Sequence, residues 1–192
     1  MKKILFIAAF GICLIANFFP APCPAAGKDS VSDKVWHTLE TSHTIILYKS
    51  TEDLKKFNDA VDYSPAVTDV RWLYLHNANT LEEKIRNKAD AIFERVQEIL
   101  DMRKPMKKVS INLYNSRENL QKAFLYVTKS TTPYRAGYIF EYNTIYLNVT
   151  DLHAGMLAHE MAHAIIDHYM TVRPPSATAE ILARYVDSHL MR

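Results

Sequence analysis

The chain has 192 residues, a length that suits one domain, or one domain preceded by a leader. Its 23 basic and 21 acidic residues nearly balance, which argues against nucleic-acid binding, because that function needs a basic footprint. Cysteine occurs only at Cys13 and Cys23, so the chain beyond these positions can form no disulfide within itself and must rely on its own core.

The first 26 residues have the three parts of a secretory signal peptide. Lys2 and Lys3 form a basic start, Ile4–Phe19 is an uncharged apolar run, and Pro20–Ala26 is a small, proline-rich exit. The run is shorter than the ~20 apolar residues of a bilayer span, so a cleaved leader is favoured over a retained anchor. We therefore expect a bacterial exported protein, periplasmic or extracellular. Cleavage would remove the two lysines and leave 21 basic and 21 acidic residues.

Periodicity and turn signals predict a single α+β domain over residues 27–192, with no repeat and no internal linker. The predicted strands are His43–Lys49, Val109–Tyr114, Gly137–Tyr142 and Thr144–Val149, with Val70–Leu75 as a further candidate. The predicted helices cover residues 51–60, 81–102, 116–127, 152–170 and 177–189. The candidate N-caps are Ser50 or Thr51 for the first helix, Asn79 or Thr80 for the second, Asp151 for the fourth and Ser176 for the fifth.

The main chemical signature is the run His159-Glu160-Met161-Ala162-His163, which reads HExxH inside the predicted helix 152–170. Residues four apart on a helix lie on one face, so His159 and His163 can direct two imidazoles at one metal ion. Glu160 has the place of the general base in the metalloprotease form of this motif. The surrounding residues are apolar or small, and polar groups in such a segment need partners. The run therefore predicts a metal site.

A catalytic zinc site usually has three protein ligands and a fourth, open position. The metzincin pattern would need His at position 169 and Gly at position 166, but the chain has Tyr169 and Ile166 there. His168, five residues after the second histidine, points off the ligand face. Glu180, in the predicted last helix, is the better candidate. The alternative for Glu180 is an ordinary ion pair with Arg184, four residues further along the same helix.

The segment Glu180-Ile181-Leu182-Ala183-Arg184-Tyr185 resembles the glutamate helix of gluzincin metallopeptidases, which carries Glu-Gly-hydrophobic-Ala-x-Tyr after HExxH. Within that group the chain is most similar to small peptidase MA-like, or minigluzincin-type, domains. The resemblance implies a zincin-like fold in which a small mixed sheet packs on helices. It also implies a Zn2+ ion held by His159, His163 and Glu180, with Glu160 as the catalytic base. Ile181 departs from the pattern, where glycine is usual.

The expected function is that of an exported zinc metallopeptidase, which hydrolyses peptide bonds by a metal-activated water with Glu160 as general base. We expect a peptide or protein substrate that adds to Thr144–Asn148 as an edge strand, a monomer, and no membrane span in the mature chain. Two alternatives stay open. One is a catalytically weak zincin-fold module that acts as a cell-envelope interaction protein. The other is a latent peptidase whose cleft is blocked by the N-terminal third or the C-terminal tail.

Overall fold

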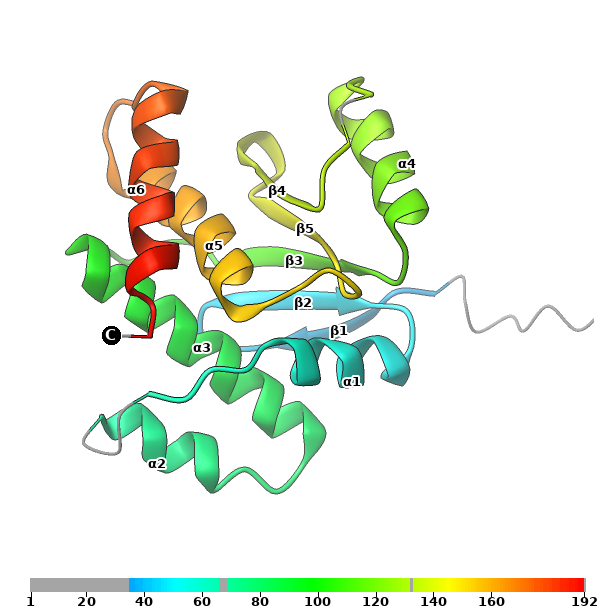
Figure 1. The fold of residues 1–192 in the computed structure, drawn as a ribbon, viewed down its shortest axis with the longest axis vertical. Helices are drawn as coiled ribbons and strands as arrows, with labels where there is room; N and C mark the ends of the chain where they lie inside the picture. The colour runs from blue at the N-terminus through cyan, green and yellow to red at the C-terminus, as the bar shows by residue number, and fades with distance from the viewer. Residues whose placement is uncertain (1–34, 66–68, 132, 192) are drawn as a thin grey trace, which may run out of the picture. The chain divides into compact units, whose positions relative to one another are not determined.

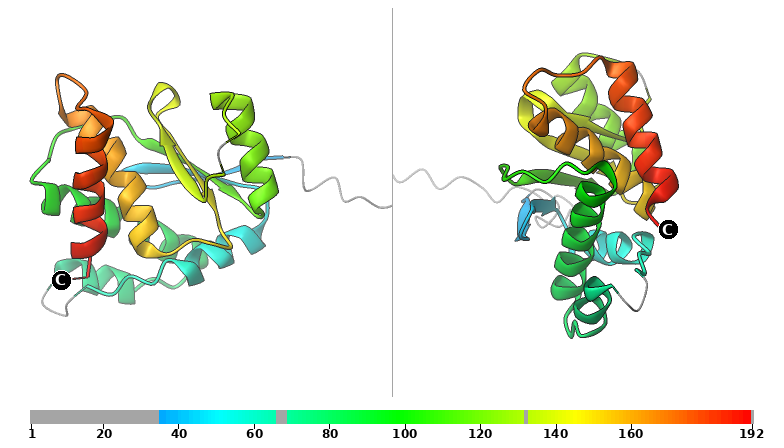
Figure 2. Two further views of the ribbon diagram at one scale, coloured as in Figure 1. Left: turned by 45° about the horizontal axis from the view of Figure 1, so that its top comes forward. Right: turned by 90° about the vertical axis from the view of Figure 1, so that its left-hand side faces the viewer.

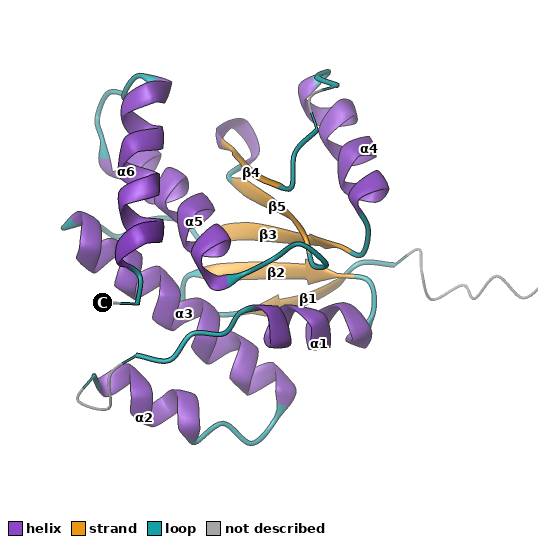
Figure 3. Ribbon diagram, viewed as in Figure 1, coloured by secondary structure: helices purple, strands orange, loops and turns teal. Residues whose placement is uncertain are grey.

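The computed structural model describes residues 35–65, 69–131 and 133–191, which fall in one compact unit. The predicted signal peptide, residues 1–26, lies outside the described residues. Within them, five strands form a mixed sheet and six α-helices accompany it, so the fold class is α+β as expected (Figures 1 and 3). The strands are β1 (His37–Glu40), β2 (Thr44–Tyr48), β3 (Val109–Tyr114), β4 (Ala136–Ile139) and β5 (Thr144–Asn148). The helices are α1 (Thr51–Ala60), α2 (Val70–His76), α3 (Leu81–Leu100), α4 (Arg117–Thr128), α5 (Ala154–Tyr169) and α6 (Ser176–His189).

The strand order across the sheet is β1-β2-β3-β5-β4. The three inner strands are parallel, and β1 and β4 run antiparallel to their neighbours at the two edges. The register places Leu39, Ile46, Ile111 and Ile145 in one row across four strands, and all four side chains are buried. This row belongs to the main hydrophobic core.

The expectation that Thr144–Asn148 is an edge strand is wrong. This segment is β5, which pairs with β3 on one side and with β4 on the other, and every one of its residues is buried. The edge strand next to it is β4. Strand-like sequence does not distinguish an inner strand from an edge strand, because that depends on which segments pair.

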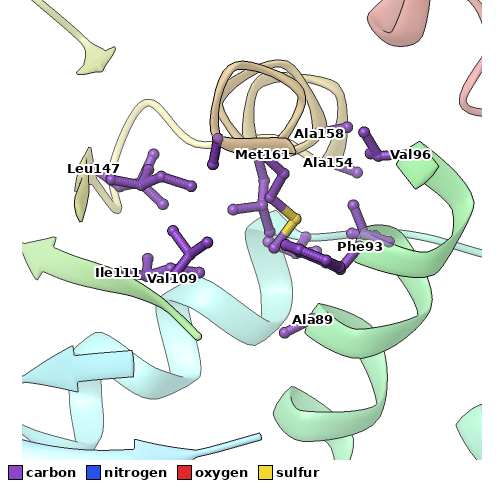
Figure 4. Packing of buried hydrophobic residues seen from close by; sticks show 14 of the residues in the cluster. Ala89, Phe93, Val96, Val109, Ile111, Leu147, Ala154, Ala158 and Met161 are labelled. Atoms are coloured by element: carbon purple, nitrogen blue, oxygen red, sulfur yellow. The ribbon is translucent and has the colours of Figure 1, made fainter. Parts of the chain in front are cut away.

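The main core lies between the sheet and the helices α1, α3, α5 and α6. Figure 4 shows its centre, where Met161 of α5 lies among Phe93 of α3 and Val109 and Ile111 of β3. Met161 and Phe93 are both fully buried. Alanines at helix contacts, such as Ala158 of α5, allow close approach of α5 to its neighbours. Helix α4 forms a second, smaller cluster with the sheet, in which Leu120 and Phe124 pack with Ile139 and Tyr146.

Several predicted boundaries are confirmed to within a residue or two. Strands β2 and β3 and helices α1, α3 and α4 lie where periodicity placed them. The side chains of Ser50, Thr80 and Ser116 accept hydrogen bonds from backbone N–H groups in the first turns of α1, α3 and α4. These caps satisfy backbone donors that have no partner inside the helix.

The further strand candidate, Val70–Leu75, is wrong, because this segment is helix α2. The Asp69 side chain caps the helix by accepting from the Arg71 N–H at 2.9 Å. The Arg71 guanidinium then pairs with Glu98 of α3 at 2.7 Å, and Asn87 of α3 donates to the carbonyl of Tyr74 at 2.7 Å. Contacts with α3 therefore support a helix in a segment whose apolar pattern is equally compatible with a strand.

Two helix caps and one hairpin also differ from expectation. His153, not Asp151, caps α5, and its Nδ1 accepts from the Met156 N–H at 3.1 Å. Asp151 instead pairs with Arg117 of α4 at 2.8 Å. Ser176 is the first residue of α6 and does not cap it. The predicted strand Gly137–Tyr142 ends at Ile139, and a 3-10 turn follows before the turn residue Asn143, whose φ is 47°.

Across the described ranges, no helix is both long enough and apolar enough to cross a membrane.

Candidate metal centre

Helix α5 presents the two motif histidines on the one side that the core leaves open. Leu157, Met161 and Ile165, spaced by four residues, are fully or almost fully buried in the core. The side chains of His159 and His163 are 20% and 22% exposed and line a cavity next to the sheet edge. The helical period therefore divides α5 into an apolar face that fixes the helix and a polar face that forms the site.

Glu180 reaches the histidines from α6, which packs along α5 (Figures 1 and 2). The Nε2 atoms of His159 and His163 are 3.3 Å apart, and Glu180 Oε2 lies 3.5 Å from each of them. A tetrahedral site with metal–ligand distances of 2.0–2.1 Å has ligand atoms separated by about 3.3–3.4 Å. The three side chains thus match one face of such a tetrahedron, and this group could hold a metal ion.

The two possible roles of Glu180, as a metal ligand and as the ion-pair partner of Arg184, are compatible in the structure. Arg184 Nε donates to Glu180 Oε1 at 2.8 Å, while Oε2 faces the two histidines. Burial raises the pKa of Glu180, but the Arg184 hydrogen bond and the two histidines outweigh it, so its pKa lies below the usual value. The carboxylate is therefore held in its charged form, which is the form that coordinates a metal.

The imidazole of His163 is also held in the form that a metal requires. Burial lowers its pKa, and the nearby His159 lowers it further, while Glu180 and Asp167 act in the opposite direction with less effect. A neutral imidazole has a free lone pair for a metal, whereas the protonated ring has none.

Glu160 lies beside this group but is not part of it. Its side chain lines the cavity although the residue is only 8% exposed, and its Oε2 accepts the Tyr138 N–H of β4 at 2.8 Å. Burial raises the pKa of Glu160 to about 7, against the lowering effect of that hydrogen bond, and the negative charge of Glu180 raises it further. A carboxylate with a pKa near neutrality is suited to accept and return a proton.

The cavity has a volume of about 600 Å3 and brings together four parts of the chain. It is lined by Tyr134 with the edge strand β4 that follows it, the polar face of α5, the connection between α5 and α6, and the first turns of α6. Its lining residues all lie between Tyr134 and Glu180, so none of the described residues of the N-terminal third or the C-terminal tail lies in it. The described part of the chain therefore offers no support for a cleft blocked by either segment.

Close packing of α5 and α6 determines where Glu180 sits. A Cβ atom at Gly155, in the first turn of α5, would overlap the carboxylate of Asp187 of α6. Asp187 thus lies at the start of α5, two helical turns from Glu180, and a side chain at position 155 would require the Asp187 carboxylate to move. Ala179, which precedes Glu180, and Ala183 are buried between the helices.

Other histidines and tyrosines of the region take different places. His168 Nδ1 lies 2.8 Å from the Ala164 carbonyl of its own helix, in line with its predicted position off the ligand face. Tyr185 and His189 stack on each other at 4.0 Å on α6, and neither lines the cavity. Tyr138 does line it, with its hydroxyl 3.4 Å from Asn143 Oδ1.

Sequence reasoning missed two features of the site. One is the backbone N–H of Tyr138, which holds Glu160 and which no side-chain pattern could indicate. The other is Asp167, one turn beyond His163 on α5, whose side chain is 5% exposed and pairs with Arg173 at 3.2 Å. The four-residue spacing from His159 through His163 to Asp167 is the signal that could have indicated it.

No family model, curated protein or solved structure matches the chain.

Proposed function

We propose that the protein is a zinc-dependent metallopeptidase with a zincin-like site. The observation that carries the proposal is the arrangement of three groups that could hold a metal ion, at tetrahedral spacing beside a buried carboxylate, all lining one cavity. The resemblance of the segment Glu180–Tyr185 to the gluzincin glutamate helix supports the same function. A purely structural metal site would not need Glu160 in this place.

The donor set favours zinc. Two imidazole nitrogens and one carboxylate oxygen form a ligand set that is common in catalytic zinc sites, and three protein ligands leave a fourth position open. When bound, the ion would polarise a carbonyl group and lower the pKa of a water molecule toward neutrality. His159, His163 and Glu180 would hold it.

Glu160 is the residue that moves the proton in this proposal. It accepts a proton from the attacking water and returns it to the nitrogen of the cleaved peptide bond. The Tyr138 N–H keeps its carboxylate beside the candidate metal ligands, and the burial of Glu160 keeps away most of the water that would otherwise stabilise its charge. The positive charge of a bound ion would favour the ionised, basic form of Glu160.

The edge strand β4 gives an extended peptide a place to bind. Tyr138 directs its N–H away from β5 toward Glu160, and alternate residues of an antiparallel strand direct their backbone groups to the same side. Ala136 therefore faces the cavity side as Tyr138 does, and both residues line the cavity. A peptide that adds to this edge would lie across the metal site and would be recognised mainly through its backbone.

Metal analysis and a matched pair of variants test the proposal. Protein purified without chelator should contain about one equivalent of zinc, as a three-ligand site implies. It should cleave peptides of a quenched fluorescent library, and Glu160→Gln should abolish cleavage while zinc stays bound. Glu52→Gln, at an exposed position on α1, serves as the control that should cleave normally. Zinc binding without any cleavage by the parent would favour the envelope interaction module instead.

Export remains part of the proposal and rests on residues 1–26 alone. Fractionation of the native host should place the protein outside the cytoplasm with its N-terminus near residue 27. Intact Met1 in the membrane fraction would support a retained anchor instead.

A further inference from the structure

An arginine lines the same cavity as the candidate metal ligands. Arg173 follows α5 in the short connection to α6, and its side chain and that of Asp167 both line the cavity. Pro174 comes directly after it, which restricts the backbone of Arg173 to extended conformations. The guanidinium group is thus attached to a short and conformationally restricted segment.

Two neighbours hold the guanidinium group in place. Its Nε donates to Asp167 Oδ1 at 3.2 Å, and its central carbon lies 4.9 Å from the centre of the Phe140 ring. Asp167 belongs to α5, and Phe140 belongs to the 3-10 turn that follows β4, so the arginine connects α5 with the segment that follows the edge strand. A side chain held by a carboxylate on one edge and an aromatic ring on one face loses little further freedom when it binds a ligand.

The pair with Asp167 leaves most of the guanidinium available. The Asp167 side chain is 5% exposed, but that of Arg173 is 57% exposed. Among the described residues, the hydrogen bond to Asp167 engages only Nε, and neither terminal nitrogen of Arg173 has a protein partner. Guanidinium presents five N–H donors in a planar fork, and two parallel donors on one edge match a carboxylate.

The spacing along α5 relates this arginine to the bond that is cleaved. Asp167 lies four residues after the metal-ligand candidate His163, a rise of about 6 Å along the helix. One residue of an extended peptide covers about 3.3–3.6 Å. A carboxylate bound at Arg173 would therefore belong to a residue within one to three positions of the cleaved bond.

We propose that Arg173, held by Asp167 and Phe140, binds a carboxylate group of the peptide substrate and so makes the enzyme selective for peptides that carry a carboxylate near the cleaved bond. The proposal rests on the proposed function, because it takes the cavity as the peptide site. The carboxylate can be that of an aspartate or glutamate side chain or the free C-terminus of the peptide. Both present the same planar anion to the guanidinium fork.

Binding measurements test this inference without relying on hydrolysis. The protein is the zinc-loaded Glu160→Gln variant, and binding is followed by fluorescence anisotropy. One peptide pair is blocked at both ends and carries glutamate or glutamine near its centre. The second pair has a neutral sequence with either a free C-terminal carboxylate or an amide. We expect the carboxylate peptide of at least one pair to bind about tenfold more tightly, the effect of one charge-assisted hydrogen bond in a partly exposed site.

Variants then assign the preference to the arginine. Arg173→Gln in the same background should reduce the ratio within the selective pair to about one, with binding of the neutral peptide unchanged. Arg117→Gln removes an arginine of similar exposure that also pairs with an aspartate but lies outside the cavity, and it should leave the ratio intact. If Arg173→Gln fails to fold because Asp167 is left unpaired, the double variant Asp167→Asn with Arg173→Gln removes both charges and should show the same loss of preference.

The outcomes separate this inference from the proposed peptidase function. A carboxylate preference that is absent from both pairs, or that survives the loss of Arg173, overturns the inference. Failure of every carboxylate peptide to bind at millimolar concentration overturns it as well. If the zinc-loaded parent cleaves the carboxylate member and the neutral member of both peptide pairs equally well, the peptidase proposal is supported and the carboxylate-site proposal is overturned. If the carboxylate preference in binding is present but the parent cleaves no peptide, the carboxylate-site proposal is supported and the peptidase proposal is overturned.

Discussion

Replacing Glu160 by glutamine should stabilise the metal-free protein, in a way that depends on pH. Burial raises the pKa of this carboxyl group from 4.5 to about 7 in the folded protein. The folded state therefore binds the proton more tightly than the unfolded state, and the free energy of unfolding falls as pH rises from 4.5 to about 7. Above pH 7 the buried Glu160 is charged, and the free energy of unfolding is lowered by the full amount that burial of this charge costs.

The pKa change corresponds to roughly 3 kcal/mol of destabilisation at high pH, because each pKa unit is worth about 1.4 kcal/mol. Glutamine has the same shape, keeps an oxygen that can accept the Tyr138 N–H, and carries no charge. Its amide must still be accommodated, so we expect a gain of about 2–3 kcal/mol at pH 8. The gain should shrink by about 2 kcal/mol at pH 5, where folded Glu160 is protonated and most unfolded chains are ionised.

Urea denaturation in the presence of a chelator, at pH 5 and pH 8, measures this difference for the parent and the variant. Glu180→Gln is the control of opposite sign. The pKa of Glu180 lies below its usual value, so its charge stabilises the fold above the unfolded pKa and the variant should lose stability at pH 8. A stability gain from Glu160→Gln that is equal at both pH values, or a loss at pH 8, would refute the argument that burial of charge controls this site.

Three other measurements address the ligand, the core and the leader. Glu180→Ala should lower zinc affinity by orders of magnitude, whereas Arg184→Ala should change it little, because an exposed i,i+4 pair contributes only a few tenths of a kcal/mol. Competition with a chromophoric chelator measures the zinc affinity of both variants and the parent. Equal affinities would remove Glu180 from the site. Met161→Ala should lower the free energy of unfolding by about 2–5 kcal/mol, since this side chain is fully buried, while Val172→Ala, at an 80% exposed position, should have little effect. N-terminal sequencing of exported protein should begin near residue 27, and a start at Met1 would contradict cleavage.

The sequence alone was sufficient for the features that depend on neighbours along the chain. The HExxH spacing placed His159 and His163 on one face of a helix, because the helical period is a local property. The candidate caps Ser50 or Thr51 and Asn79 or Thr80 marked two helix starts, since each cap involves only the first turn that follows it, and the structure has Ser50 and Thr80 in these places.

Tertiary structure decided the features that depend on segments far apart in the chain. Val70–His76 is helical and has polar bonds to α3, although its apolar pattern is compatible with a strand. On that side of the sheet, β4 rather than β5 is the edge strand, because β5 pairs with β3 and β4. The sequence could name Glu180 as a candidate ligand but could not choose between the histidines and Arg184. The packing of α6 on α5 places one oxygen of the Glu180 carboxylate beside the two histidines, while the other oxygen accepts from Arg184. Only the folded chain sets the distances from Glu180 to the histidines.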